Sequence, residues 1–331
     1  MKYIGIDAHS STCEMSVKDK EGVEIDHARI ETNGRLLVDY LRGIEGPKKI
    51  VFEESEISHW LYGLFRDEAD EVVVCNPVVN AGYKDKKTDK YDAGKLADLL
   101  RGKFVSGVYH DGSERERFRV LMSGYEDLIG DVIRLKNRYK SLFRKKGLSI
   151  RGESVYGKKE WLQKLGDGDE RFIGERLFQS IERLEEERRG YVDRIKSRSR
   201  RFKEIKYLKT LTGIGVIQAA KIVGQVVDPE RFGSKHKYWS YCGLARHRQI
   251  SGGRTYGSKK IHGNLTLKCV YKMAAHQAIR CKGSLKDYYE ALRLKGVNHE
   301  EAKNAVSRKI AAISLHLWKY GEEYDEKKLK G

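Results

Sequence analysis

The order of strand-like segments at the start of the chain limits the fold more than any other feature. Three stretches alternate or run apolar, as strands do, and short polar turns join them: residues 2–7, 12–18 and 23–31. Three consecutive strands with such short links predict an antiparallel meander. Helices and strands then alternate, with helices expected near 34–43 and 57–68, strands at 48–53 and 71–76, and a helix at about 89–103.

Two residues mark helix boundaries within this region. Asn33 is a suitable N-cap for the first helix, and Gly102 is a suitable stop for the last one. A meander followed by alternating helices and strands predicts an α/β domain with a mixed sheet of the RNase H-like type over residues 1–112.

The pattern changes at residue 113 to long, highly charged helices. Two helical patterns, over 118–143 and 175–202, are separated by a glycine-bearing loop at 147–168. They predict an antiparallel, coiled-coil helical arm over residues 113–205. A helix pair this polar buries little surface by itself, so dimerisation and an ordinary helical subdomain stay equal alternatives.

Residues 206–331 are expected to form a mainly α C-terminal domain. Gly213 and Gly215 lie between two helical patterns and resemble the turn of a helix-hairpin-helix, which offers backbone N–H groups to a phosphate. A structural turn explains the two glycines equally well, although the basic surroundings favour binding. We expect the nearby aromatic residues to pack the core of this domain, with base stacking as the alternative: Tyr238, Trp239 and Tyr241.

Composition excludes several classes of protein. The 331 residues are 39% hydrophobic and 34% charged, which is typical of a soluble globular chain. No apolar run approaches the roughly 18 residues of a membrane span, so no membrane partner is expected. The five cysteines are scattered and form no CxxC pair, which argues against a zinc site and for a reducing, cytoplasmic location.

Charge is distributed unevenly along the chain. The net charge is +18, yet residues 1–112 contain 16 Lys and Arg against 21 Asp and Glu, and the remainder contains 50 against 27. The first third therefore carries −5 and the rest +23. A basic region of this size suits phosphate neutralisation, and an acidic one suits metal binding. The alternative is a solvated basic surface without a ligand.

Four carboxylates of the first third form a candidate metal site. Asp7 closes the first strand, Glu53 ends the fourth, and Asp89 and Asp92 stand three residues apart on one helix face. Each alone is explained by a turn, a cap or a surface position. Together they favour a site for Mg²⁺, with Mn²⁺ as the alternative ion, since oxygen ligands on paired ions support phosphoryl transfer. The choice between Glu53 and its neighbour Glu54 is open.

A second candidate site is the stretch "RHRQISGGRTYGSKK". Ser251 precedes Gly252 and Gly253, which would let the backbone approach a ligand without a Cβ clash. Five cations of this stretch would grip phosphates: Arg246, Arg248, Arg254, Lys259 and Lys260. The residues alone leave Ser251 equally open to two interpretations, a turn residue in a basic loop or a nucleophile.

These motifs together resemble the DEDD transposases of the IS110 insertion-sequence family, which includes Piv-type DNA invertases. The resemblance covers most of the chain, and the helical middle matches in character more than in motif. Its anchors are "GIDAH", "FEES", "KTDKYDAGKLADLL", "LTGIGVIQAAKIV", "RFGSKHKYWSYCGL", "SGGRTYGSKKIHGN" and "LTLKCVYKMAAHQA". Three departures bear on DNA contacts more than on chemistry: Thr212 and Arg246 replace usual prolines, and Lys268 replaces a usual arginine.

The resemblance implies a RuvC-like N-terminal domain, a coiled-coil insertion and a C-terminal transposase domain. It assigns the acidic tetrad to Asp7, Glu53, Asp89 and Asp92 and the serine nucleophile to Ser251, and it places Asn264 in the "GN" element, which we expect to bind nucleic acid. It further implies recombination of donor and target double-stranded DNA in a prokaryotic cytoplasm or nucleoid, guided by a structured RNA. Dimers assembling into tetramers would bring acidic and serine sites of different subunits together.

Two rival functions stay open at this point. A junction-resolving metal nuclease with water as nucleophile needs the carboxylates but neither Ser251 nor a covalent adduct. A non-catalytic nucleic-acid-binding scaffold predicts an incomplete acidic cluster, whereas all four candidate acids are present.

Overall fold

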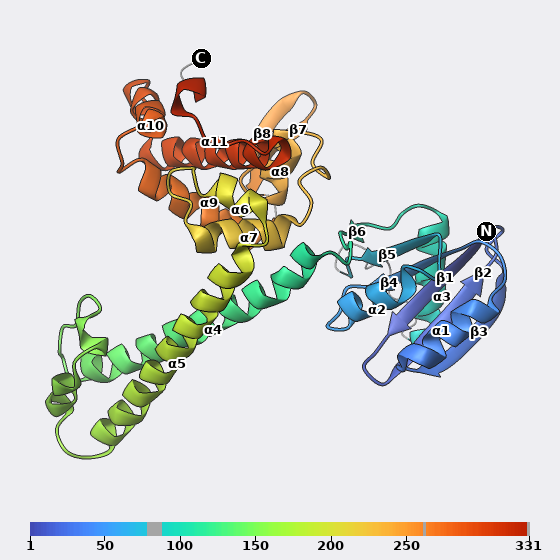
Figure 1. The fold of residues 1–331 in the computed structure, drawn as a ribbon, viewed down its shortest axis with the longest axis horizontal. Coiled ribbons are helices and arrows are strands. Elements are labelled where there is room, and N and C mark those ends of the chain that lie inside the picture. Colours follow the sequence, from blue (N-terminus) through green and yellow to red (C-terminus); the bar gives the residue numbers. More distant parts are fainter. Residues whose placement is uncertain (78–87, 261–262, 330–331) are drawn as a thin grey trace. The chain divides into compact units, whose positions relative to one another are not determined.

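The computed structural model describes residues 1–77, 88–260 and 263–329. They fall into two compact units, Met1–Ser113 and Glu114–Gly331, each of which is described by itself (Figure 1). No helix within the described ranges is both long and apolar enough to cross a membrane. The predicted division into three domains stays a prediction.

The first unit is built on a mixed sheet of six strands in the order β3-β2-β1-β4-β5-β6. The strands are β1 (Lys2–Ala8), β2 (Thr12–Lys18), β3 (Glu24–Glu31), β4 (Lys48–Glu53), β5 (Glu71–Cys75) and β6 (Gly107–Val108). β1, β2 and β3 form the predicted antiparallel meander, and β4 and β5 extend it in parallel with β1. The predicted mixed α/β sheet is thus confirmed and is consistent with an RNase H-like fold.

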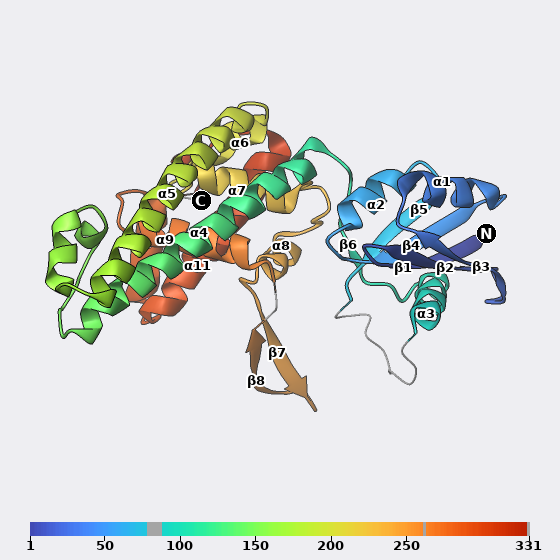
Figure 2. The same cartoon turned by 90° about the horizontal axis from the view of Figure 1, so that it is seen from below.

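Three helices cover the two faces of this sheet: α1 (Gly34–Gly43) and α2 (Ser58–Phe65) on one face and α3 (Asp89–Arg101) on the other (Figure 2). As predicted, Asn33 caps α1, because its side chain accepts hydrogen bonds from the backbone N–H groups of Arg35 and Leu36. Helix α2 is shorter than predicted, since the charged residues after Phe65 turn the chain into β5.

The strands alternate between the two faces. On the α1 and α2 face, Ile4, Ile6 and Phe52 join a buried cluster, and on the α3 face Val51 packs with Leu96. This alternation decides which side chains of β1 and β4 lie near α3.

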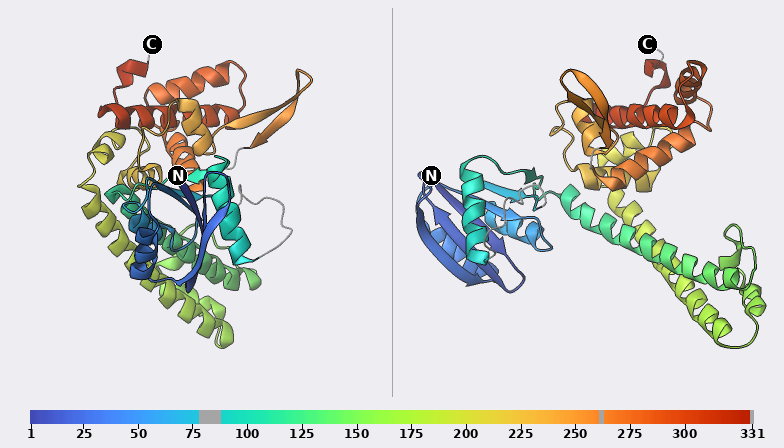
Figure 3. Two further views of the ribbon diagram at one scale, coloured as in Figure 1. Left: turned by 90° about the vertical axis from the view of Figure 1, so that its right-hand side faces the viewer. Right: turned by 180° about the vertical axis from the view of Figure 1, so that it is seen from behind.

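The second unit begins with two long antiparallel helices, α4 (Glu114–Lys145) and α5 (Asp169–Ser199) (Figure 3). The connection between them was predicted as a loop, but it contains two short 3-10 helices, η1 (Ser154–Tyr156) and η2 (Lys159–Leu165). The reason is a separate small core, in which Val155 and Leu165 pack with Tyr139, Phe143 and Phe178 of the long helices. Coiled-coil supercoiling and dimerisation stay predictions.

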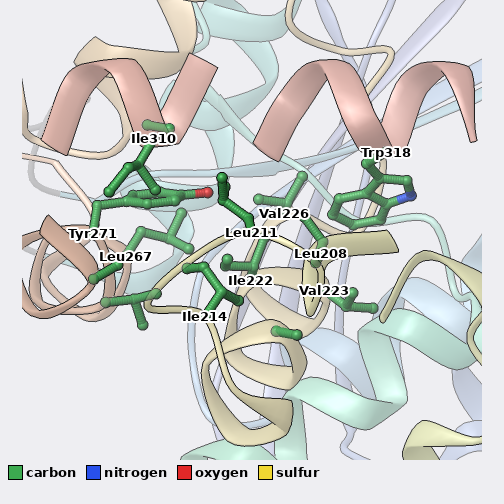
Figure 4. Close-up of a cluster of buried hydrophobic side chains, with 14 of the residues drawn as sticks. Leu208, Leu211, Ile214, Ile222, Val223, Val226, Leu267, Tyr271, Ile310 and Trp318 are labelled. Carbon is green, nitrogen blue, oxygen red and sulfur yellow. The ribbon is translucent and has the colours of Figure 1, made fainter. Parts of the chain in front are cut away.

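The rest of this unit is mostly helical, as predicted. It contains α6 (Lys203–Leu208), α7 (Val216–Val226), α8 (Lys235–Tyr241), β7 (Arg246–Ser251), β8 (Arg254–Lys260), α9 (Leu265–Ala278), α10 (Ser284–Leu294), α11 (His299–Tyr320) and η3 (Glu326–Leu329). Figure 4 shows Ile310 and Trp318 of α11 facing Leu211, Ile222 and Tyr271 in one buried cluster.

The three aromatic residues of α8 pack this core, as predicted. The Tyr238 hydroxyl lies 2.5 Å from that of Tyr271, and the Trp239 indole N–H donates to the Arg308 carbonyl at 2.8 Å. The Tyr241 hydroxyl donates to the backbone carbonyl of residue 225 at 2.9 Å. Their polar atoms are thus used within the fold.

Candidate active site

Asp7 and Glu53 occupy neighbouring positions at one end of the sheet. Strands β1 and β4 are parallel, their last pair is Ile6 with Phe52, and Asp7 and Glu53 follow directly. Because side chains alternate along a strand, and Ile6 and Phe52 face α1 and α2, both acids belong to the α3 face. Asp7 is half-buried in the fold, whereas Glu53 is exposed.

Asp89 and Asp92 lie in the first turn of α3. An N-cap role is one alternative for Asp89, but the cap is Thr88, whose hydroxyl accepts from the Tyr91 N–H. Acidic side chains in a first turn are stabilised by the positive end of the helix dipole. Because Thr88 caps the helix, the carboxylates of Asp89 and Asp92 are available for another role.

The approach of α3 to β1 depends on Gly5. A Cβ at residue 5 would lie 2.0 Å from the Ala93 carbonyl oxygen and 2.5 Å from the Ala97 nitrogen. The Lys18 ammonium on β2 also bonds the Asp98 carboxylate of α3 at 2.5 Å. These contacts hold the first turn of α3 beside the end of β1.

His9 joins this acidic site and was missed as a functional residue. Its Nε2 lies 3.2 Å from the Asp7 carboxylate and 4.0 Å from the Asp89 carboxylate, and ligand atoms of all three residues lie within 4.8 Å of one another. The D-x-H spacing after a strand is a sequence signal for this residue, but a polar turn explains a histidine there equally well. The structure thus brings Asp7, His9 and Asp89 together.

Burial is the main cause of a raised pKa of Asp7. The hydrogen bond and charge of His9 lower this pKa, whereas the nearby negative charges of Asp89 and Asp92 raise it. The negatively charged carboxylates of Asp89 and Asp92 therefore lie close enough to Asp7 to repel its charge. A divalent cation would stabilise this arrangement.

Two further glutamates lie in β2, which pairs with β1, and directly after β4. Glu14 is paired with Asp7 across the β1–β2 ladder, and its Oε2 is buried with no hydrogen-bond donor among the described residues. Glu54 instead accepts a hydrogen bond from the buried His110 ring at 2.9 Å. The carboxylates of Asp7 and Asp89 and the buried, unpartnered Oε2 of Glu14 are oxygen donors of the kind that a divalent ion takes, so the residues present fit such an ion.

Ser251 lies at the tip of a hairpin formed by β7 and β8, which project from the helices of the second unit (Figure 2). It pairs with Arg254 across the turn, and Gly252 and Gly253 have φ of 55° and 74°. Two positive φ values define a type I′ turn, which favours glycine at both positions. Among the described residues, nothing beyond the adjacent residues lies within 4 Å of a Cβ built on either glycine, so the turn conformation, and not crowding, explains them.

The five predicted phosphate-binding cations are all part of this hairpin. Arg246 begins β7 and Arg254 begins β8, and both are exposed. The ladder places residue 246 opposite residue 260 and residue 247 opposite residue 259. Arg248, Lys259 and Lys260 have described backbones, but their side chains lie outside the described part of the structure.

The base of the hairpin is fixed by two glycines. A Cβ at Gly263 would lie 2.4 Å from the Gly243 nitrogen, so the chain entering β7 and the chain leaving β8 are in direct backbone contact. Asn264, predicted to bind nucleic acid, caps α9 by accepting from the Leu267 N–H at 2.9 Å, and its amide donates to the Gln225 side chain at 2.7 Å. The fold therefore supplies a structural role for Asn264.

Gly213 and Gly215 form the turn between α6 and α7. Gly213 has φ of +87°, and a Cβ there would lie 2.5 Å from the Ala274 carbonyl oxygen. Gly215 is the N-cap of α7, and Ile214 between them is buried in the core. The turn therefore has a packing reason, and its predicted helix-hairpin-helix contact with phosphate stays a prediction.

Comparison with known proteins identifies the family. A family model described as "Transposase", for the DEDD domain of the IS110 group, matches residues 4–146, and one described as "Transposase IS116/IS110/IS902 family" matches residues 205–290. The chain belongs to the IS110 family of transposases. The first match contains the four acids and His9, and the second contains the glycine turn and Ser251.

One curated relative of the IS110 family is also similar. It is the "Insertion element IS110 uncharacterized 43.6 kDa protein" of Streptomyces coelicolor, 24% identical over 152 residues. The similar region covers 46% of this chain and 38% of the relative. The chain thus matches well under two thirds of that protein's length.

Proposed function

We propose that this IS110-family chain is a DNA transposase that cuts and rejoins DNA through a serine–phosphate intermediate. The observation that carries the proposal is the convergence of Asp7, His9 and Asp89 at the end of β1, in the N-terminal region matched by the transposase model. The exposed Ser251 at a hairpin tip, in the region matched by the second model, supports it.

In the proposed reaction the acidic residues hold the metal. Asp7, Glu53, Asp89 and Asp92 would supply oxygen ligands, as Mg²⁺ prefers. We favour Glu53 over Glu54, because Glu53 shares the α3 face with Asp7 and Glu54 bonds His110. Bound divalent ions would promote loss of the hydroxyl proton and neutralise charge developing on the phosphate.

Ser251 would act as the nucleophile. Its Oγ forms a bond to phosphorus while the bond from phosphorus to one deoxyribose oxygen breaks. The serine proton leaves Oγ, and the departing oxygen gains a proton, so one DNA end is released as a hydroxyl and the other stays on the protein. Attack by a hydroxyl from a second DNA end reverses these steps and rejoins the strands.

The charge of the C-terminal region supports a polyanionic partner. Residues 231–286 contain 13 Lys and Arg and no Asp or Glu. The hairpin ladder pairs residue 246 with residue 260 and residue 247 with residue 259, so basic residues of the sequence occur on both strands. Phosphates of donor and target DNA would neutralise this charge.

Guidance and assembly complete the proposal. The family resemblance supports a structured RNA from the element's own ends as the guide, and dimers that assemble into tetramers on DNA. Strand exchange would then require both the acidic residues and Ser251, and it would take place at the nucleoid of a prokaryotic cell.

The test is strand exchange between plasmids that carry an end of the element and a candidate target, with RNA transcribed from the element ends. We expect Ser251→Ala and Asp7→Asn to abolish strand exchange. The control is Thr255→Ala, which removes another exposed hydroxyl of the same hairpin and should retain exchange. Denaturing gels should show a labelled DNA–protein adduct with the wild type only. Cleavage by Ser251→Ala without an adduct would instead show a metal nuclease that uses water.

A further inference from the structure

His9 is held in a fixed position beside the two aspartates. Its backbone N–H donates to the Thr12 carbonyl at 3.0 Å, and its carbonyl accepts from the Thr32 hydroxyl at 2.7 Å. Both bonds tie the turn after β1 to neighbouring strands, so the imidazole is presented to Asp7 and Asp89 by a backbone that is itself anchored.

The distances around His9 match those between ligands of one ion. Six-coordinate ions with bonds of about 2.1 Å place adjacent ligand atoms about 3 Å apart and opposite ones about 4.2 Å apart. The separations from Nε2 to the Asp7 and Asp89 carboxylates are 3.2 Å and 4.0 Å. The imidazole side chain is 54% exposed, so water and ions reach it.

We propose that His9 is a direct nitrogen ligand of the metal and that the site therefore binds Mn²⁺ in preference to Mg²⁺. This inference rests on the proposed metal-dependent function. Mg²⁺ binds carboxylates and water and takes nitrogen ligands poorly, whereas first-row transition ions accept imidazole together with carboxylates. The histidine thus changes a ligand set of oxygen atoms only, which suits Mg²⁺, into one of oxygen and nitrogen atoms.

Glu14 provides a second observation. Its buried Oε2, directly across the ladder from Asp7, has no hydrogen-bond donor among the described residues. A buried carboxylate oxygen without a donor is costly in free energy. An ion at Asp7 and His9, or water bound to that ion, would satisfy this oxygen.

The test measures metal binding directly, on the full-length protein after removal of metals with a chelator. Electron paramagnetic resonance of free Mn²⁺ gives its Kd, and competition gives the Kd of Mg²⁺. Pulsed measurements on the bound Mn²⁺ detect coupling to ¹⁴N of a coordinated imidazole. The variants are His9→Ala, Asp7→Asn and, as matched control, His316→Ala, whose side chain is also 54% exposed and lies 3.7 Å from a carboxylate, that of Glu322.

We expect the wild type to bind Mn²⁺ more tightly than Mg²⁺ by on the order of tenfold or more. His9→Ala should weaken Mn²⁺ binding by on the order of 10- to 100-fold, leave Mg²⁺ binding little changed and remove the ¹⁴N coupling. His316→Ala should behave as the wild type. Thermal unfolding of each metal-free variant reports whether it is folded.

Different failures point to different errors. If Asp7→Asn abolishes Mn²⁺ binding but His9→Ala keeps both the affinity and the ¹⁴N coupling, His9 is not a ligand and only this inference is wrong. If Asp7→Asn also leaves Mn²⁺ binding unchanged, the ion is not bound at this site. That result overturns both the inference and the proposed role of the acidic residues.

Discussion

Gly5 of β1 and Ala93 of α3 are in backbone contact, and no side chain fits between them: a Cβ at residue 5 would lie 2.0 Å from the Ala93 carbonyl oxygen. The partner atom is backbone, so it cannot rotate away. The contact places the first turn of α3, with Asp89 and Asp92, beside the end of β1 that carries Asp7.

Gly5→Ala should therefore push α3 away from the sheet. We expect a loss of about 3 kcal/mol in the free energy of unfolding of the first unit, together with weaker metal binding at Asp7 and Asp89. Denaturant unfolding measures the first effect and Mn²⁺ titration the second. Gly63→Ala in α2 is the matched control, because a Cβ built there meets no described residue outside its own helix within 4 Å. A Gly5→Ala protein as stable as this control would contradict the argument.

Gly263 makes a comparable contact in the second unit. Gly263→Ala should separate the two ends of the hairpin, since its Cβ would lie 2.4 Å from the Gly243 nitrogen. We expect destabilisation by about 2 kcal/mol and a clear loss of DNA affinity, measured by calorimetry and by fluorescence anisotropy. Gly233→Ala, with open space around its Cβ, should change neither quantity.

Tyr256 is a large aromatic residue close to Ser251 and is 73% exposed. If the hairpin binds DNA, its ring is available to stack on a base, a contact that contributes roughly 1–3 kcal/mol. Tyr256→Ala should then weaken DNA binding by about 5- to 150-fold without lowering Tm. Tyr320→Ala removes a similarly exposed ring, 66% exposed, from the end of α11. Equal losses of affinity in both variants would rule out a specific role for Tyr256.

Glu185 makes the stability of the helix pair of α4 and α5 depend on pH. Burial raises its pKa, but the hydrogen bonds from Lys136 at 2.8 Å and Arg188 at 2.6 Å outweigh burial, so the pKa is lowered overall. A lowered folded-state pKa means that this stabilisation is complete above the ordinary glutamate pKa and is lost as pH falls through the lowered value.

We therefore expect the Tm of the wild type to fall more steeply below about pH 4.5 than that of Glu185→Gln, which should be less stable at neutral pH. Thermal melts followed by circular dichroism between pH 7 and pH 3 measure both. Glu187→Gln, whose carboxylate is 50% exposed and 3.9 Å from Arg183, should follow the wild-type curve.

Local patterns predicted the first unit well because its strands obey a period of two. That period predicts where β1 and β4 end, and hence that Asp7 and Glu53 lie at these ends. Asn33 is likewise recognisable as a helix cap from the sequence. The two-residue strand β6 is too short to show any period. His9 became part of the site only through the packing of α3 on β1, a contact between distant segments that no local pattern encodes.

The second unit was predicted less completely, for a different physical reason. Strands β7 and β8 carry cations and polar residues on both faces, so they lack the alternation that identifies a half-buried strand. Only the Ser251-Gly252-Gly253 turn gave a signal there. Likewise, η1 and η2 form because Val155 and Leu165 pack into a small core at the ends of α4 and α5. The charged sequence of this loop gives no local pattern that predicts such a core.

The hairpin of β7 and β8 has a consequence for the timing of chemistry. Two strands by themselves are marginally stable in water, and this pair has no third strand beside it among the described residues. A nucleophile at its tip would become fixed in orientation only when a partner binds both strands. Part of the free energy of association would then offset the entropy lost in aligning Ser251. Mismatched DNA that fails to clamp the hairpin would then be rejected kinetically, with no dedicated blocking segment.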